Sequence, residues 1–301
     1  MNAAGDQAGE LRRLVEEKRQ AIRRRGRLRT VAVLSGKGGV GKSNLALSMA
    51  CAMADRGRRV VVMDADLGLA NLDLLCGVSP QHNLSHLVEG SRGLTEVLTP
   101  VPREERVTLL SGGVGLKAMA DLDDDALQRV FGALEDLESR ADVLILDTGA
   151  GIHHGVLAFA HAADLTLLVT TPEPTSVRDA YGVIKSLGPA EAGRELLLVV
   201  NMASSRAEAL DVADRIRRAS ARFLERSPSY LGCVLRDACV ERAVRGRGIF
   251  YRASPYSSAS RCVGELADAL LQWGEERTAP PETRGLRSFF ARLARGFFME
   301  K

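Results

Sequence analysis

The feature that most constrains this chain is a glycine-rich loop placed between a buried strand and a helix. After the apolar run TVAVLS (30–35), and before a helical pattern that ends near Gly57, come Gly36, Lys37, Gly38, Gly39, Val40, Gly41, Lys42 and Ser43. This fits GxxxxGK[ST] in its required strand–loop–helix context. Backbone N–H groups in such a loop turn toward phosphate oxygens, and the helix start adds its positive dipole end. The loop predicts a nucleotide phosphate site.

Side chains at the end of this loop predict how a nucleotide is held. We expect Lys42 to bind the β- and γ-phosphates, Ser43 to ligate Mg²⁺, and Asn44 to complete the ATP-binding loop. Lysine is scarce in the chain, with six residues among 41 basic ones, yet two of the six lie in this short loop.

The middle of the chain alternates short apolar runs with helical patterns. The runs, rich in Val, Ile and Leu, are residues 30–35, 59–64, 106–111, 142–147, 164–170, 195–200 and 230–235. The helical patterns cover about 42–56, 122–139, 175–187, 205–225, 237–246 and 257–276. Continuous apolar strands separated by helices are typical of a parallel sheet covered on both faces. We predict an α/β fold, a doubly wound and mostly parallel sheet of about seven or eight strands.

Carboxylates follow two of these strands. Asp64 and Asp66 end the second run, and Asp147 ends the fourth, as a Walker B carboxylate should. Side chains at the carboxyl ends of parallel strands point into the ligand crevice. Asp147 is therefore expected to hold Mg²⁺ through water.

Composition excludes several protein classes. The chain has 301 residues, of which 46% are hydrophobic and 26% charged, as in ordinary globular proteins. It contains no apolar run long enough to cross a membrane, and its start lacks the apolar segment of a signal peptide. Five scattered cysteines without a CxxC pair argue against a disulfide framework or a zinc site. We expect a cytoplasmic protein.

Charge divides the chain into an acidic body and two basic tails. Residues 10–29 hold nine basic and three acidic side chains, and residues 284–301 hold five and one. We expect a flexible basic N-terminal segment (1–29), a nucleotide-binding domain (30–277), and a linker with an amphipathic helix (278–301). Apolar side chains of that helix fall on one arc: Leu286, Phe289, Phe290, Leu293 and Phe297. A basic helix with aromatic residues favours binding to an anionic membrane surface, although docking on the protein's own core or on a partner stays open.

The first lysine of the loop, Lys37, indicates a resemblance to a known family. With Lys37 the loop reads KGGxGK[ST] and resembles the deviant Walker A family, the MinD/ParA ATPases; TTPEPTSVRDAY (170–181) is similar to a MinD segment. The resemblance implies an ATP-bound homodimer in which Lys37 reaches the partner's phosphates. It also implies that Asp66 positions the attacking water, that Asp64 supports Mg²⁺, and that Asn201 reads adenine. For Asn201 a turn-forming role remains the alternative.

The N-terminal segment resembles the FlhG (FleN/YlxH) group of flagellar-number ATPases. Its DQAxxLR pattern places five matches at Asp6, Gln7, Ala8, Leu11 and Arg12. This resemblance implies activation of an SRP-type flagellar GTPase (FlhF), and contact with the inner face of the membrane when ATP is bound. Flagellar basal-body proteins or a flagellar transcription factor are further candidate partners, and no direct DNA binding is expected. The alternatives are a DNA-partition ATPase and a small-molecule P-loop enzyme of the synthetase type.

Overall fold

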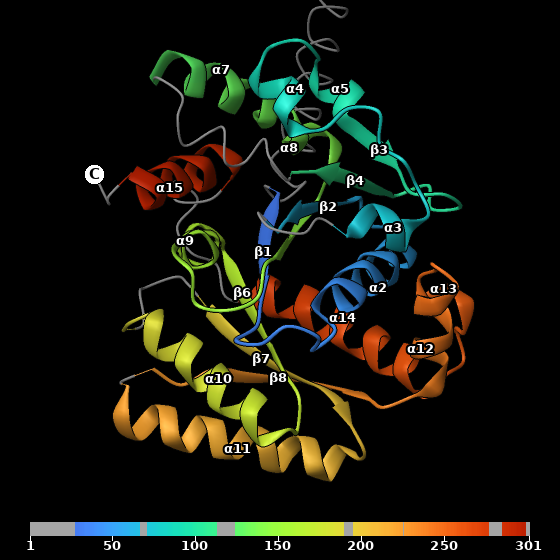
Figure 1. Cartoon of the computed structure of the whole chain (residues 1–301), viewed down its shortest axis with the longest axis vertical. Coiled ribbons are helices and arrows are strands. Elements are labelled where there is room, and N and C mark those ends of the chain that lie inside the picture. The colour runs from blue at the N-terminus through green and yellow to red at the C-terminus, as the bar shows by residue number, and fades with distance from the viewer. Residues whose placement is uncertain are drawn as a thin grey trace, which may run out of the picture.

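The structure is a computed structural model that describes residues 28–66, 71–112, 124–189, 195–224, 226–276 and 285–298. An eight-stranded sheet runs through these ranges, with helices on both faces (Figure 1). The strands are β1 (Arg29–Leu34), β2 (Val60–Ala65), β3 (Leu98–Pro100), β4 (Val107–Ser111), β5 (Val143–Thr148), β6 (Leu165–Thr170), β7 (Glu195–Ala203) and β8 (Ser229–Leu235).

The strand order is β3-β4-β2-β5-β1-β6-β7-β8. Every described pairing is parallel except that of β3 with β4. Nearly every residue of β1, β2, β5 and β6 is buried, which explains why these strands read as continuous apolar runs rather than as alternating ones. The register pairs Asp64 on β2 with Asp147 on β5, so both carboxylates lie at the same level of the sheet.

One face of the sheet is covered by helices that pack on the even-numbered positions of β1. Their apolar residues share one core cluster. They are α4 (Leu84–Val88), α5 (Leu94–Val97), α7 (Asp124–Glu135), α8 (Leu137–Arg140), α9 (His154–Ala162), α10 (Pro174–Ser186), α11 (Arg206–Phe223) and α15 (Leu286–Phe298).

The other face is covered by a second core cluster in which α2 is the central helix. This layer contains α2 (Lys42–Asp55), α3 (Leu72–Cys76), α12 (Ala238–Arg245), α13 (Phe250–Ala253) and α14 (Ser258–Glu276). The predicted doubly wound architecture is therefore confirmed. Among the described residues, no helix is long and apolar enough to cross a membrane.

Some elements were not predicted, for identifiable reasons. Strand β3 is three residues long, partly exposed, and ends in proline, so it offers no apolar run. Helix α9 is apolar on most sides, with sequence HGVLAFAHA, and therefore shows little of the one-sided pattern that identifies a surface helix. The helix predicted over 122–139 is described as α7 and α8.

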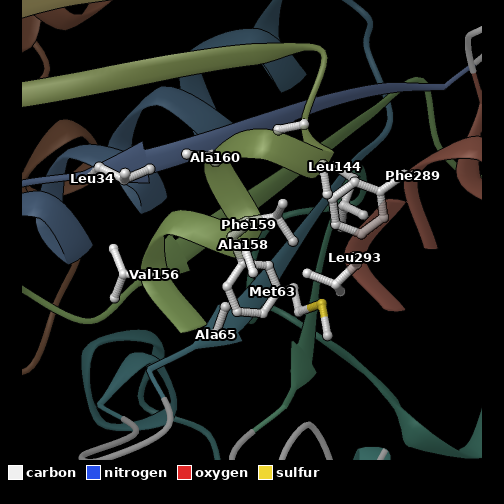
Figure 2. Packing of buried hydrophobic residues seen from close by; sticks show 14 of the residues in the cluster. Leu34, Met63, Ala65, Leu144, Val156, Ala158, Phe159, Ala160, Phe289 and Leu293 are labelled. Carbon is white, nitrogen blue, oxygen red and sulfur yellow. The ribbon is translucent and has the colours of Figure 1, made fainter. Parts of the chain in front are cut away.

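The C-terminal helix α15 packs onto the body of the protein, against α9 and α7 (Figure 1). Leu286, Phe289, Phe290 and Leu293 are at most 2% exposed. Phe290 stacks on Phe131 of α7 at 5.4 Å between ring centroids. Figure 2 shows Phe289 and Leu293 within the same cluster as residues of β2, β5 and α9. In this structure, the apolar arc that we expected to face lipid thus faces protein. The side chain of Phe297 lies outside the described residues.

Candidate nucleotide-binding site

The glycine-rich loop joins the end of β1 to the start of α2, at the centre of the sheet. Gly39 and Gly41 have φ values of 78° and 90°, a conformation that glycine adopts without strain. A Cβ on Gly36 would lie 2.3 Å from the backbone oxygen of Asp179 in α10. The loop therefore needs these glycines both for its turns and for its close approach to the neighbouring helix.

Lys42 lies inside the site rather than on its surface. Its side chain is buried, and its Nζ donates to Ser35 Oγ at 2.9 Å. Ser35 Oγ in turn donates to the carbonyl oxygen of Lys37 at 2.8 Å. Burial lowers the pKa of Lys42, and the charges of Asp147 and Asp66 oppose that shift. The ammonium group is thus held next to two carboxylates, as expected for a lysine that meets phosphate and a metal ion.

Asp147 has the burial and the hydrogen-bonding pattern expected of a carboxylate that helps to hold a metal ion. It is 3% exposed, and its Oδ1 has no hydrogen-bond partner among the described residues. Burial raises the pKa of Asp147 to about 7, with Asp64 adding to the shift and a hydrogen bond from Ser43 opposing it. A buried carboxylate oxygen without a partner is costly unless a ligand pairs with it. Ser43 and Asp147 together therefore fit Mg²⁺.

No group of three His, Cys, Asp or Glu side chains forms a metal cluster in the described part of the chain. Such a sparse donor set suits Mg²⁺, which is usually held by one or two protein groups, phosphate oxygens and several waters.

Asp64 accepts three hydrogen bonds from backbone N–H groups of residues that follow β2. Its Oδ2 accepts from the backbone N–H groups of Asn71 at 3.0 Å and Leu72 at 3.1 Å, at the start of α3. Its Oδ1 accepts from the backbone N–H of Asp66 at 3.2 Å. Burial raises the pKa of Asp64, and these three N–H groups oppose the shift. By accepting the backbone N–H of Asp66, Asp64 fixes the position of Asp66 after β2.

Asp66 lies against the segment that follows β5. A Cβ on Gly149 would be 3.2 Å from Asp66 Oδ1, closer than nearly all real side chains come. Residue 149 therefore has to be small for Asp66 to keep this position. The same segment is fixed from β1, because Gly151 N–H donates to Ser35 O at 2.8 Å and Thr148 Oγ1 to Val33 O at 2.9 Å.

Asn201, on β7, contacts the glycine-rich loop directly. Its Nδ2 donates to Val40 O at 2.7 Å, and its Oδ1 accepts from Met202 N–H at 2.9 Å. A Cβ on Gly41 would lie 2.5 Å from Asn201 Nδ2. Asn201 thus braces the loop in this structure; its predicted contact with adenine is untested.

Lys37, unlike Lys42, is exposed at the surface of the site. Its side chain is 41% exposed, and its Nζ makes an ion pair with Glu173 at 2.7 Å and a hydrogen bond to Thr175 Oγ1 at 3.3 Å. The Lys37 ammonium holds the pKa of Glu173 below its usual range. The two lysines of one loop therefore point to different places, one into the site and one across its rim toward the start of α10.

Comparisons with known proteins place this geometry in a family. A model of the ParA family, described as the NUBPL iron-transfer P-loop NTPase, matches residues 27–216. The chain belongs to the ParA family of P-loop NTPases. Like other members it is an ATPase.

Within the ParA family, similarity is high to two proteins with flagellar names. The antiactivator FleN of Pseudomonas aeruginosa is 36% identical, over 87% of this chain and 92% of FleN. The flagellum site-determining protein YlxH of Helicobacter pylori is 33% identical, over 89% of this chain and 90% of YlxH. The septum site-determining protein MinD of Escherichia coli is 34% identical, over 56% of this chain and 63% of MinD.

Solved ParA-family structures agree with the fold. MinD of Pyrococcus furiosus has a TM-score of 0.64 at 21% identity, covering 82% of this chain and 99% of its own. MinD of Pyrococcus horikoshii, complexed with Mg-ADP, has a TM-score of 0.63 at 20% identity, covering 84% of this chain and 100% of its own.

The structure brings most of the predicted ParA-family site together. The loop, Lys42, Ser43, Asp64, Asp66, Asp147 and Asn201 converge at the carboxyl ends of β1, β2, β5 and β7. Asn44 lies in the first turn of α2. The predicted partner-activating residues, Asp6 to Arg12, lie outside the described residues. Three further site residues were not predicted from the sequence: Ser35, Glu173 and Thr175. The signals available for them were the position of Ser35 at the end of the first apolar run and that of Glu173 at a helix start.

Proposed function

We propose that this protein is an ATP-dependent dimerising switch that regulates flagellar number or placement. The observation that carries the proposal is the contrast between the two lysines of the loop. Lys42 is enclosed beside Asp66 and Asp147, whereas Lys37 is exposed at the rim. A lysine that lies outside the phosphate site of its own subunit can stabilise phosphate charge if it reaches the nucleotide bound by a second subunit. The similarity to FleN and YlxH supports the flagellar role.

The proposed chemistry is hydrolysis of ATP between two subunits. Mg²⁺ would neutralise charge on the phosphates, held by Ser43 and, through water, by Asp64 and Asp147. Lys42 would stabilise phosphate charge within its own subunit, and Lys37 in the partner. Asp66, fixed by Asp64 and adjacent to Gly149, would orient the attacking water. To act across the dimer, Lys37 would exchange Glu173 for phosphate oxygens.

Light scattering with ATP tests the dimer. Lys37→Ala should bind ATP within a few-fold of wild type yet remain monomeric, because the charge that crosses the interface is gone. Asp66→Ala should bind ATP and accumulate as a dimer, because hydrolysis slows by roughly 10²-fold or more. Lys185→Ala, which removes an exposed lysine of α10, is the matched control and should dimerise normally. Dimerisation of the Lys37 variant at the wild-type level would refute the role across the interface.

Membrane association is part of the same proposal. The apolar, aromatic arc of α15, together with the arginines of the same helix, would bind anionic lipid once the helix leaves the body. Two such helices on one dimer act at high effective concentration and bind far more tightly than one. ATP should therefore recruit the protein to anionic liposomes, whereas ADP should not. Equal sedimentation with both nucleotides would contradict this coupling.

The proposal also gives the N-terminal segment a partner, an SRP-type flagellar GTPase. The spacing of Leu11, Leu14, Val15 and Ile22 in the sequence would place them on one stripe if this segment forms a helix on binding, which would suit a groove on another protein. A peptide of residues 1–25 should stimulate GTP hydrolysis by that GTPase without the ATPase body. Gln7→Ala leaves peptide charge unchanged and should remove the stimulation, since an amide there would orient water. A wild-type peptide without effect would remove this partner from the proposal.

A further inference from the structure

Two cysteines lie together at the open edge of the sheet. Cys233 belongs to the edge strand β8, and Cys262 belongs to α14, which packs against β8. Both thiols are free and buried, and each lies near enough to shift the pKa of the other. Neither belongs to the nucleotide site described above. Two neighbouring thiols on different elements can be oxidised to a disulfide, which a single buried cysteine cannot form within the chain.

The sulfur of Cys262 is surrounded by donors. It interacts with the Cys233 thiol, with the backbone N–H of Leu235, and with Arg206 Nη2 at 3.9 Å. An ion pair with Glu265 at 2.8 Å keeps the Arg206 guanidinium over the sulfur. These groups stabilise negative charge on Cys262, and the hydrogen bond from Cys233 contributes most to lowering its pKa. The same pairing raises the pKa of Cys233, which is thereby kept as the protonated partner.

The other three cysteines serve as a contrast within the same chain. Burial raises the pKa of Cys51 and Cys239, and it raises the pKa of Cys76 to about 12. Their sulfurs lack an arginine that outweighs burial, so they stay as unreactive thiols. Thiolate character and a resolving partner are what distinguish oxidation-sensitive cysteines from structural ones.

An exposed arginine side chain contacts the buried sulfur of Cys262. Arg206 is 56% exposed on the surface and lies directly over the sulfur. Cys262 is buried, and the exposed Arg206 side chain is among the groups that cover it. Reaction with a small neutral oxidant would require Arg206 to move aside.

We propose that Cys262 and Cys233 are a peroxide-reactive dithiol that closes a disulfide between α14 and β8. The Cys262 thiolate attacks one oxygen of hydrogen peroxide, the O–O bond breaks, and hydroxide leaves, giving a sulfenic acid. The Cys233 sulfur then attacks the oxidised sulfur, an S–S bond forms, and the sulfenic oxygen leaves as water with the Cys233 proton. Two thiols and one peroxide thus become one disulfide and two waters. The S–S bond brings the two sulfurs to about 2 Å.

Peptide mapping of the full-length chain tests the proposal without any substitution. The protein is treated with hydrogen peroxide, unreacted thiols are alkylated after denaturation, and peptides are analysed without reduction. We expect a cross-linked peptide pair containing Cys233 and Cys262, reversed by dithiothreitol, while Cys51, Cys76 and Cys239 remain alkylated. Absence of that pair, or equal oxidation of all five cysteines, would overturn the proposal.

Two variants assign the roles of the individual groups. Cys233→Ser should leave Cys262 to form a sulfenic acid, trapped by dimedone, with no disulfide. Arg206→Gln should slow peroxide oxidation of Cys262 by up to about tenfold, since a pKa rise of one unit lowers the thiolate fraction by that factor at most. Arg218→Gln, on the same helix and 80% exposed, is the matched control and should change nothing. Dimedone labelling at Cys233 rather than at Cys262 would reverse the assignment and contradict the mechanism.

Discussion

At the scale of single residues, Asp147 is held in a state that costs stability. Its carboxyl has a folded pKa near 7 because of burial, against an ordinary value of 3.8 in the unfolded chain. Between those values, the unfolded chain releases a proton that the folded protein retains. Stability of the nucleotide-free protein should therefore fall as pH rises from about 4 to about 7, and the full cost applies above that range.

Asp147→Asn is expected to remove this cost. In EDTA at pH 8, the variant should be more stable than wild type by on the order of 2 kcal/mol, with a smaller gain at pH 5. Thermal unfolding of both proteins at the two pH values measures this difference in stability. Adding Mg²⁺ and ATP should reverse the order, because wild type gains a metal ligand that the amide lacks. A variant that is less stable than wild type at pH 8 in EDTA would show that the Ser43 hydrogen bond outweighs burial.

Gly149 offers a second test at this scale. Gly149→Ala places a methyl group 3.2 Å from Asp66 Oδ1, so the carboxylate has to move by a few tenths of an ångström. We expect kcat for ATP hydrolysis to fall by about tenfold or more with little change in nucleotide affinity. Gly182→Ala in α10, where an added Cβ meets nothing within 4 Å, is the control. Equal kcat values for both variants would argue that Asp66 does not need its present position.

The sequence predicted the residues of the site better than their contacts. The glycine-rich loop, Asp64 and Asp147 follow apolar runs, and strand ends in a parallel sheet meet by geometry alone. The pairing of Lys37 with Glu173 joins residues far apart in the chain, and it depends on β6 and α10 lying beside β1. No local pattern contains that information. Likewise, the close fit of Gly149 against Asp66 joins two segments that are far apart in the chain, and it is visible only in three dimensions.

At the scale of elements, α15 is held by polar contacts as well as by its apolar arc. Arg292 donates to Ala162 O at 2.6 Å, where α9 ends, and lies 3.7 Å from Asp164. The backbone N–H of Leu286 donates to Glu138 Oε1 at 2.6 Å. A Cβ on Gly296 would lie 3.1 Å from Ala158 Cβ, so the two helices approach closely. Periodicity predicted the arc, but these partners come from α8, α9 and the following turn.

Removing the polar contact should loosen the helix without altering its apolar arc. Arg292→Gln is expected to increase binding to anionic liposomes in the presence of ADP by several-fold, because docking on the body competes with lipid. Arg295→Gln removes the same charge from an exposed position whose described contact is within its own helix, and it should weaken binding slightly. Co-sedimentation compares the two. Reduced binding by both variants to the same extent would mean that charge alone matters.

At the scale of the whole molecule, the nucleotide site and the docked helix share one element. The segment after Asp147 turns at Gly151 and leads directly into α9, which begins at His154. The same helix α9 packs against α15. A change in the segment that meets the phosphates would therefore be transmitted to the surface on which α15 rests, with no intervening loop.

This arrangement predicts that ATP loosens α15 through dimerisation. Amide hydrogen exchange of residues 286–298 should increase in wild type with ATP relative to ADP, because movement of α9 opens the contact at Gly296 and Arg292. Lys37→Ala should bind ATP without this increase, since its phosphate site is intact but the partner's lysine is missing. Exchange in α11, which lies on the same face and packs against β7, β8 and α10, serves as the internal reference. If α15 exchange rises equally in the Lys37 variant, nucleotide binding alone releases the helix, and the dimer is needed only to bring two helices to one membrane.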